Sequence, residues 1–149
     1  MPAERRFFTH RQASALLAEI TSLFKQTIEA RTARQKAESG LAAYKKRLVM
    51  AGGAFPNQNR MAAYTDLAKT SYEAMKRDLD RIADLGVEVK DLDLGLIDFP
   101  ARYQGRAIYL CFRLGESNIT HWHEIEEGFD GRKLIDQEFI DQIEDGWSG

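Results

Sequence analysis

Two histidines, His121 and His123, are the residues of this chain best suited to chemistry, and one position separates them. In a β-strand, residues two apart point to the same face, so both imidazoles can reach one ion. Carboxylates stand nearby in the chain or across an expected hairpin, at Asp98, Glu116, Glu126 and Glu127. Two imidazoles with carboxylates suit a divalent transition metal such as zinc, iron, nickel or manganese. The alternative, that the histidines are polar members of a half-exposed strand, stays open.

A second set of residues could bind a small anion or another ligand. The set comprises Asp98, Arg113, Glu116, Trp122 and Arg132. Its two arginines suit carboxylate or phosphate groups, or they pair with neighbouring acids. The one cysteine, Cys111, lies in the apolar run from Ile108 to Phe112, and no basic residue adjoins it. We interpret Cys111 as a packed core thiol, and we assign no catalytic residue.

Several motifs are excluded by their spacing. The run Gly115-x5-His121-x-His123-x3-Glu127 is similar to the opening of the first cupin motif. A cupin barrel needs more β-sequence and a further histidine, and none follows His123. Residues 91–95 look like a calcium loop, but the glycine comes one position early and the closing glutamate is missing. The chain has no P-loop and no Gly-x-Gly-x-x-Gly motif.

The first half of the chain predicts a helical hairpin. Apolar residues recur at helical spacing over residues 9–51, with Thr9 and Gln12 placed as a capping box. Gly40 is a weak point in this helix but not an obligatory break. A second helix over residues 60–85 ends at Gly86. The excess length of the first helix favours a coiled-coil contact with a second subunit, hence a homo-oligomer.

Past Gly86 the apolar period changes to two, which predicts a β layer over residues 87–125. Its three expected strands are residues 94–99, 107–113 and 119–125, in an antiparallel meander. Residues 134–145 predict an amphipathic tail helix that packs through Leu134, Phe139 and Ile143. The expected fold is therefore α+β: a long antiparallel helical hairpin, a small three-stranded antiparallel sheet and a short C-terminal helix, in a single domain over residues 1–149.

Charge is divided unevenly along the chain. Residues 1–85 carry 15 Lys/Arg and 9 Asp/Glu, a net of +6, whereas residues 86–149 carry 6 and 14, a net of −8. This division suits self-association through opposite fields, or it reflects solvated helix faces. A lone cysteine and the lack of a signal-peptide pattern predict a cytoplasmic protein. No apolar run is long enough to span a bilayer, so we expect no membrane partner, and we expect no nucleic-acid partner.

Several sequence blocks stand out in combination: Arg6–Thr9, Leu85–Asp91, Gly95–Pro100, Tyr109–Glu116, Trp122-His123 and Gly128–Arg132. Together they resemble a bacterial family known only as domain-of-unknown-function family 2203, and the resemblance covers roughly residues 6–133. Phe112 departs from the tryptophan usual in the family. The resemblance implies no particular activity, although the names of some members suggest cell division. It implies a shared site among Asp98, Arg113, Glu116, Trp122, His123 and Arg132, and His121 is less typical of the family.

Two functional hypotheses follow. One is a cytoplasmic scaffold or interaction protein that self-associates through its first helix. The other is a metal-dependent or small-anion-binding site on the β layer, built around His123, Glu116 and Arg113. The sequence leaves open whether the protein is an enzyme.

Overall fold

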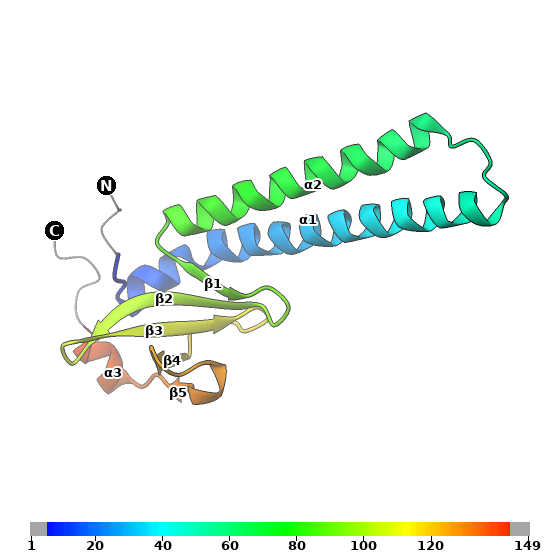
Figure 1. Ribbon diagram of the computed structural model, residues 1–149. Helices are drawn as coiled ribbons and strands as arrows, with labels where there is room; N and C mark the ends of the chain where they lie inside the picture. The colour runs from blue at the N-terminus through cyan, green and yellow to red at the C-terminus, as the bar shows by residue number, and fades with distance from the viewer. Residues whose placement is uncertain (1–5, 144–149) are drawn as a thin grey trace. The chain divides into compact units, whose positions relative to one another are not determined.

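Two long helices, joined by a short loop, open the chain in the computed structural model, which describes residues 6–143. Helix α1 spans His10–Met50 and helix α2 spans Gln58–Asp84 (Figure 1). The N-terminus of α1 has the expected capping box: the backbone N–H of Gln12 donates to Thr9 Oγ1 and that of Thr9 donates to Gln12 Oε1. Among the described residues, no helix is both long and apolar enough to cross a membrane.

Helix α1 runs through Gly40 without a break. The ring of Tyr64 from α2 packs against this position, and a Cβ atom on residue 40 would lie 2.5 Å from Tyr64 Cε1. Glycine therefore lets the two helices approach at this point, which outweighs its low helix propensity. At the end of α2, Gly86 adopts a φ of 90°, and the N–H of Val87 donates to the carbonyl of Ile82. This is the left-handed helix end that the sequence predicts.

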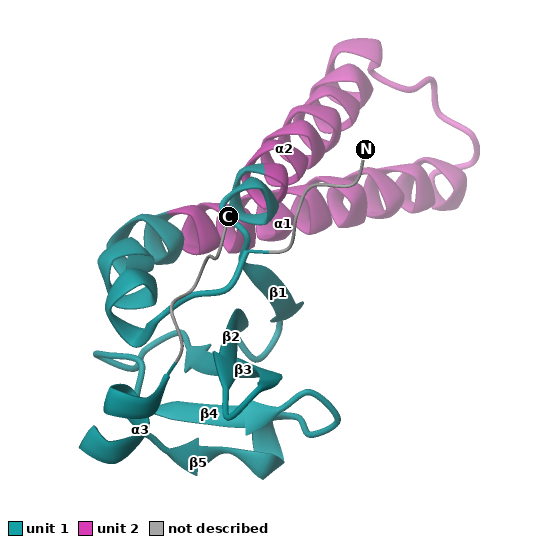
Figure 2. Ribbon diagram, turned by 90° about the vertical axis from the view of Figure 1, so that its left-hand side faces the viewer, with its two compact units in different colours: residues 1–22, 81–149 teal, residues 23–80 magenta. Residues whose placement is uncertain are grey.

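The chain divides into two compact units, which Figure 2 colours separately. One unit, Leu23–Asp80, is a helical hairpin made of the later part of α1 and most of α2. The other unit joins the start of α1, up to Ser22, to the chain from Arg81 onward, which holds the sheet.

The sheet has five antiparallel strands in chain order, not three. They are β1 (Glu88–Asp91), β2 (Leu96–Tyr103), β3 (Arg106–Arg113), β4 (His121–Glu124) and β5 (Lys133–Leu134). Strands β2, β3 and β4 correspond to the three expected strands, and β1 and β5 extend the sheet at its two edges. A two-residue strand such as β5 is too short to have a recognisable period, which is why the sequence did not predict it.

The expected tail helix is shorter than predicted. Helix α3 spans Gln137–Gln142 and follows a 3₁₀ turn, η1 (Phe129–Gly131), and strand β5. Asp136 caps α3, because its side chain accepts a hydrogen bond from the N–H of Phe139. Phe139 is buried as expected, but Leu134 lies in β5 and is 73% exposed. Positions 144 and 145 of the expected helix lie outside the described residues.

One face of the sheet is apolar and forms the core of its unit. Its side chains, all at most 2% exposed, are Ile97, Phe99, Ala101, Ile108, Leu110 and Phe112. The ring of Phe8 packs edge-on against Phe99 on this face, with ring centroids 5.4 Å apart. Burial of these side chains holds the strands in one register, because a shift by one residue would expose them.

Candidate functional site

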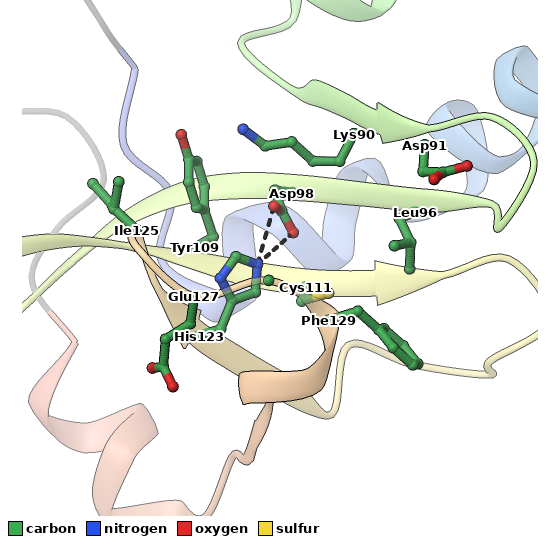
Figure 3. A pocket seen from close by; sticks show the side chains of 11 residues that line it. Lys90, Asp91, Leu96, Asp98, Tyr109, Cys111, His123, Ile125, Glu127 and Phe129 are labelled. Carbon is green, nitrogen blue, oxygen red and sulfur yellow. Dashed lines mark hydrogen bonds and ion pairs between the residues drawn. The ribbon is translucent and has the colours of Figure 1, made fainter.

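The opposite face of the sheet carries polar side chains. Asp98 of β2 is paired with Cys111 of β3, and Tyr109 of β3 is paired with His123 of β4. Since alternate residues of a strand share a face, Asp98, Cys111 and His123 all project from the face opposite Phe99 and Leu110. Three adjacent strands thus each contribute one reactive side chain to the same place (Figure 3).

The three side chains form a tight and buried group. One donor atom from each, a carboxylate oxygen, the thiol sulfur and an imidazole nitrogen, all lie within 4.8 Å of one another. Asp98, Cys111 and His123 are 2%, 1% and 3% exposed, respectively. Nε2 of His123 lies 3.1 Å from Oδ1 and 3.0 Å from Oδ2 of Asp98. We call these three residues the acid–thiol–imidazole group.

Both ring nitrogens of His123 face hydrogen-bond acceptors. Nδ1 donates to the backbone carbonyl of Glu124 at 2.8 Å, and Nε2 donates to the Asp98 carboxylate. Burial by itself lowers the pKa of His123, but the hydrogen bonds to Asp98, Cys111 and the Glu124 carbonyl outweigh it and raise that pKa to about 10. Without a metal, His123 is therefore an imidazolium ion paired with a buried carboxylate.

Cys111 is held as a neutral thiol in this environment. Burial raises the pKa of Cys111, and the lowering effect of its contact with His123 does not offset that rise. A thiol with a raised pKa is a poor nucleophile at neutral pH. A bound cation would reverse this effect, because a coordinating thiol is deprotonated.

A cavity of about 240 Å³ adjoins the group. Its lining includes Lys90 from β1, Tyr109 from β3 and Phe129 from η1, together with Asp98, Cys111 and His123 (Figure 3). The Lys90 ammonium lies 4.3 Å from the centre of the Tyr109 ring, and it donates to Glu88 Oε1 at 2.9 Å. Burial alone lowers the pKa of Lys90, but the bonds to Glu88 and Tyr109 raise it overall, so Lys90 stays protonated in its ion pair with Glu88 at the wall of the cavity.

A second polar cluster centres on Glu116. Its carboxylate accepts two hydrogen bonds from Nη2 of Arg132, at 2.9 and 2.7 Å, and one from the backbone N–H of Arg113 at 2.6 Å. His121 Nδ1 lies 3.9 Å from Glu116 Oε2. The guanidinium groups of Arg113 and Arg132 lie 5.4 and 4.7 Å from the centre of the Phe129 ring. Both guanidinium groups thus contact Phe129, and that of Arg132 is also paired with Glu116.

The candidate residues from the sequence are thus divided among three places. Asp98 and His123 lie together with Cys111. Glu116, Arg132, His121 and Arg113 lie in the second cluster, and His121 is also the cross-strand partner of Cys111. Trp122 projects from the apolar face, where its ring stacks on that of Phe139 with the ring centroids 5.1 Å apart. Glu126 and Glu127 are outside the acid–thiol–imidazole group, although Glu127 lines the cavity.

Cys111 is the residue that sequence reasoning interpreted differently. An apolar run around a cysteine usually marks a core thiol, and Cys111 is indeed buried. The signal that could have identified it is its place in the strand. It alternates with Tyr109 and Arg113, whereas Ile108, Leu110 and Phe112 form the apolar set.

The fold and the site define a class: an α+β protein with a helical hairpin and a sheet that carries a buried acid–thiol–imidazole group. Within that class, the chain belongs to the family described as "Uncharacterized conserved protein (DUF2203)", which matches residues 6–135. The resemblance drawn from the sequence blocks is confirmed. No curated protein and no solved structure matches the chain.

Proposed function

We propose that this protein binds one divalent transition metal ion, zinc in the first instance, at Asp98, Cys111 and His123. The observation that carries the proposal is the grouping of three different ligand atoms within 4.8 Å in a buried position. Carboxylate, thiolate and imidazole are the three side-chain ligands that zinc takes in proteins. The raised pKa values of His123 and Cys111 mean that the metal competes with protons for both ligands.

The distances and the surroundings suit such an ion. Nitrogen and oxygen ligands of one tetrahedral zinc lie about 3.3 Å apart, given metal–ligand lengths of about 2.0–2.1 Å. His123 Nε2 and the Asp98 oxygens are 3.0 and 3.1 Å apart, so a small outward shift admits the ion. The bond from His123 Nδ1 to the Glu124 carbonyl is the outer contact that orients metal-binding imidazoles.

Three protein ligands leave one position of a tetrahedral ion open, which is the arrangement of catalytic rather than structural zinc sites. The cavity beside the group can admit water or a small ligand to that position. The function we infer is therefore metal-dependent activation of water or of a small molecule in this cavity. We favour it over an anion site at Arg132, because Glu116 already neutralises that arginine.

The direct test is metal uptake by protein purified without a histidine tag. After incubation with zinc at neutral pH and desalting, elemental analysis should find about one zinc per chain, and Cys111→Ser and His123→Gln should lose it. His121→Gln is the matched control, since it alters the neighbouring imidazole on the same strand. Cobalt offers a second readout: the native protein should show a thiolate-to-cobalt charge-transfer band that Cys111→Ser lacks.

Two results would remove the metal proposal. One is the absence of uptake of zinc, cobalt, nickel, iron and manganese at neutral pH. The other is uptake that His123→Gln and Cys111→Ser leave unchanged, because the ion would then lie elsewhere. Circular dichroism of each variant shows whether a loss of metal merely follows a loss of fold.

Self-association through the helices is a second candidate function. Leu67 and Tyr72 of α2 are large apolar side chains that stay 49% and 44% exposed in the hairpin unit. Contact with a second chain would cover them. Light scattering at micromolar concentration should then give at least twice the chain mass, and Leu67→Ser should reduce it. A monomer at every dilution would contradict this candidate.

A further inference from the structure

The end of the helical hairpin where α1 meets α2 displays apolar side chains to solvent. Val49, Met50 and Phe55 are 76%, 79% and 98% exposed, the three highest values among the large hydrophobic residues that the structure describes. All three lie within seven positions of one another, in the last turn of α1 and the loop that follows. We call residues 45–60 the hairpin tip.

The hairpin tip is also strongly basic. Between Glu38 and Asp66 the chain has no acidic residue, whereas it has Lys45, Lys46, Arg47 and Arg60, for a net charge of +4. Lys45 and Lys46 precede Val49 and Met50 by four positions, so on the helix each lysine is next to an apolar side chain. The lysines and Arg47 are exposed. Apolar and cationic side chains thus share one small surface.

This surface is held in place by contacts inside the hairpin unit. The backbone N–H of Asn57 donates to the hydroxyl of Tyr44 at 2.7 Å, which ties the loop to α1. Asn57 also caps α2 by accepting from the N–H of Arg60 at 3.1 Å. The Arg60 guanidinium lies 4.8 Å from the centre of the Tyr44 ring. Tyr44 is 8% exposed, so the loop that carries Phe55 is bonded to a buried side chain of α1.

We propose that the hairpin tip docks onto the surface of a lipid bilayer that contains anionic lipids. Val49, Met50 and Phe55 enter the region of the headgroups, and the lysines and arginines contact the anionic headgroups around them. A projecting loop suits a deformable interface, because a protein partner would need a matching pocket for each side chain. Such docking needs no membrane-spanning run, so the lack of one among the described residues does not argue against it. The proposal replaces the sequence-based expectation of no membrane partner, which depended only on that lack.

The test uses the native chain of 149 residues and vesicles of phosphatidylcholine, with and without phosphatidylglycerol. Sedimentation should show binding to the anionic vesicles, weaker binding to the neutral ones, and loss of binding as salt increases. Phe55→Ser should weaken binding about tenfold or more, in line with the burial of a large apolar side chain. Lys45→Gln and Lys46→Gln should each weaken it about fivefold.

The matched controls lie outside the tip: Lys69→Gln and Lys76→Gln on α2 for charge, and Leu134→Ser on β5 for apolar exposure, since Leu134 is 73% exposed. Each should bind vesicles like the native chain. In Phe55→Trp, the added fluorescence should shift to shorter wavelength with anionic vesicles. No binding to anionic vesicles at low salt would overturn the proposal, as would binding that Phe55→Ser leaves intact.

Two other occupants give distinct results. Retention of duplex DNA that depends on Lys45 and Lys46 but not on Phe55, without vesicle binding, would assign the tip to nucleic acid and overturn the proposal. A dimer that Phe55→Ser dissociates, again without vesicle binding, would assign the tip to a second copy of the chain and overturn it equally.

Discussion

Nε2 of His123 lies within 3.1 Å of both carboxylate oxygens of Asp98, and the two side chains are 3% and 2% exposed. Their pairing brings opposite charges into the interior of the sheet, where each neutralises the other. The pair joins β2 to β4 across the central strand β3, and Cys111 of β3 completes the group. In protein kept free of metal by a chelator, Asp98 and His123 interact with each other and with no ion, so such protein is the sample for the stability and pH measurements below.

Asp98 and His123 should be strongly coupled in stability. Removal of either partner leaves the other buried without its counterion, so we expect Asp98→Asn and His123→Gln each to lower the free energy of unfolding by about 3–5 kcal/mol. The double variant should lose less than the sum, with a coupling energy above about 1 kcal/mol. Urea unfolding of the four proteins measures this cycle. Additive losses would show that the two side chains do not interact.

Stability should fall as pH rises through the neutral range. His123 has an unfolded pKa near 6.5 and a folded pKa of about 10, so between these values the folded chain holds the extra proton. Its contribution is complete below pH 6.5 and is lost as pH rises toward 10, at up to about 1.4 kcal/mol per pH unit. Urea unfolding between pH 7 and 8.5 tests this prediction below the ordinary pKa of Cys111.

The control for the pH series is His123→Gln, which should lack this decline. The raised pKa of Cys111 has the same sign, and its effect grows from about pH 8 as the unfolded thiol begins to ionise, so the comparison with His123→Gln, which keeps Cys111, isolates the share of His123. Stability of the native chain that is level or rises from pH 7 to 8.5, relative to His123→Gln, would contradict a protonated His123.

Glu116 and Glu127 should differ in their contribution to stability. Glu116 accepts hydrogen bonds from Arg132, and Glu127 accepts one from Lys133. The Arg132 side chain is 10% exposed, whereas that of Lys133 is 47% exposed. Glu116→Gln should cost about 2–3 kcal/mol, because it removes the countercharge of a buried guanidinium whose Nε already has no hydrogen-bond partner. Glu127→Gln should cost less than about 1 kcal/mol. Equal shifts in the urea midpoint would refute the distinction.

Gly40 should be required for helix contact rather than for backbone freedom. Alanine is favoured in a helix by about 1 kcal/mol, but a Cβ atom 2.5 Å from Tyr64 Cε1 forces the ring to move. Overpacking costs about 1–3 kcal/mol, so after the propensity gain Gly40→Ala should destabilise the chain by up to about 2 kcal/mol. In a Tyr64→Ala background the same change should stabilise it. Thermal unfolding of both pairs decides, and stabilisation in both backgrounds would count against the contact.

The sequence by itself determined the local elements of this protein. Apolar residues at helical spacing located α1 and α2, and the Thr9–Gln12 capping box and Gly86 located their ends to within two residues. The alternation of Ile108, Leu110 and Phe112 located β3 and its apolar face. These predictions succeeded because each depends on interactions between residues close in the chain.

Tertiary structure decided which distant residues meet. The register of β2, β3 and β4 places Asp98 beside Cys111 and His123, and it directs Trp122 to the other face. No local pattern encodes that register, which is set by burial of the apolar face across the whole sheet. The same holds for Gly40, whose role depends on Tyr64 of the partner helix. The sequence supplied the reactive side chains, and long-range packing brought three of them together.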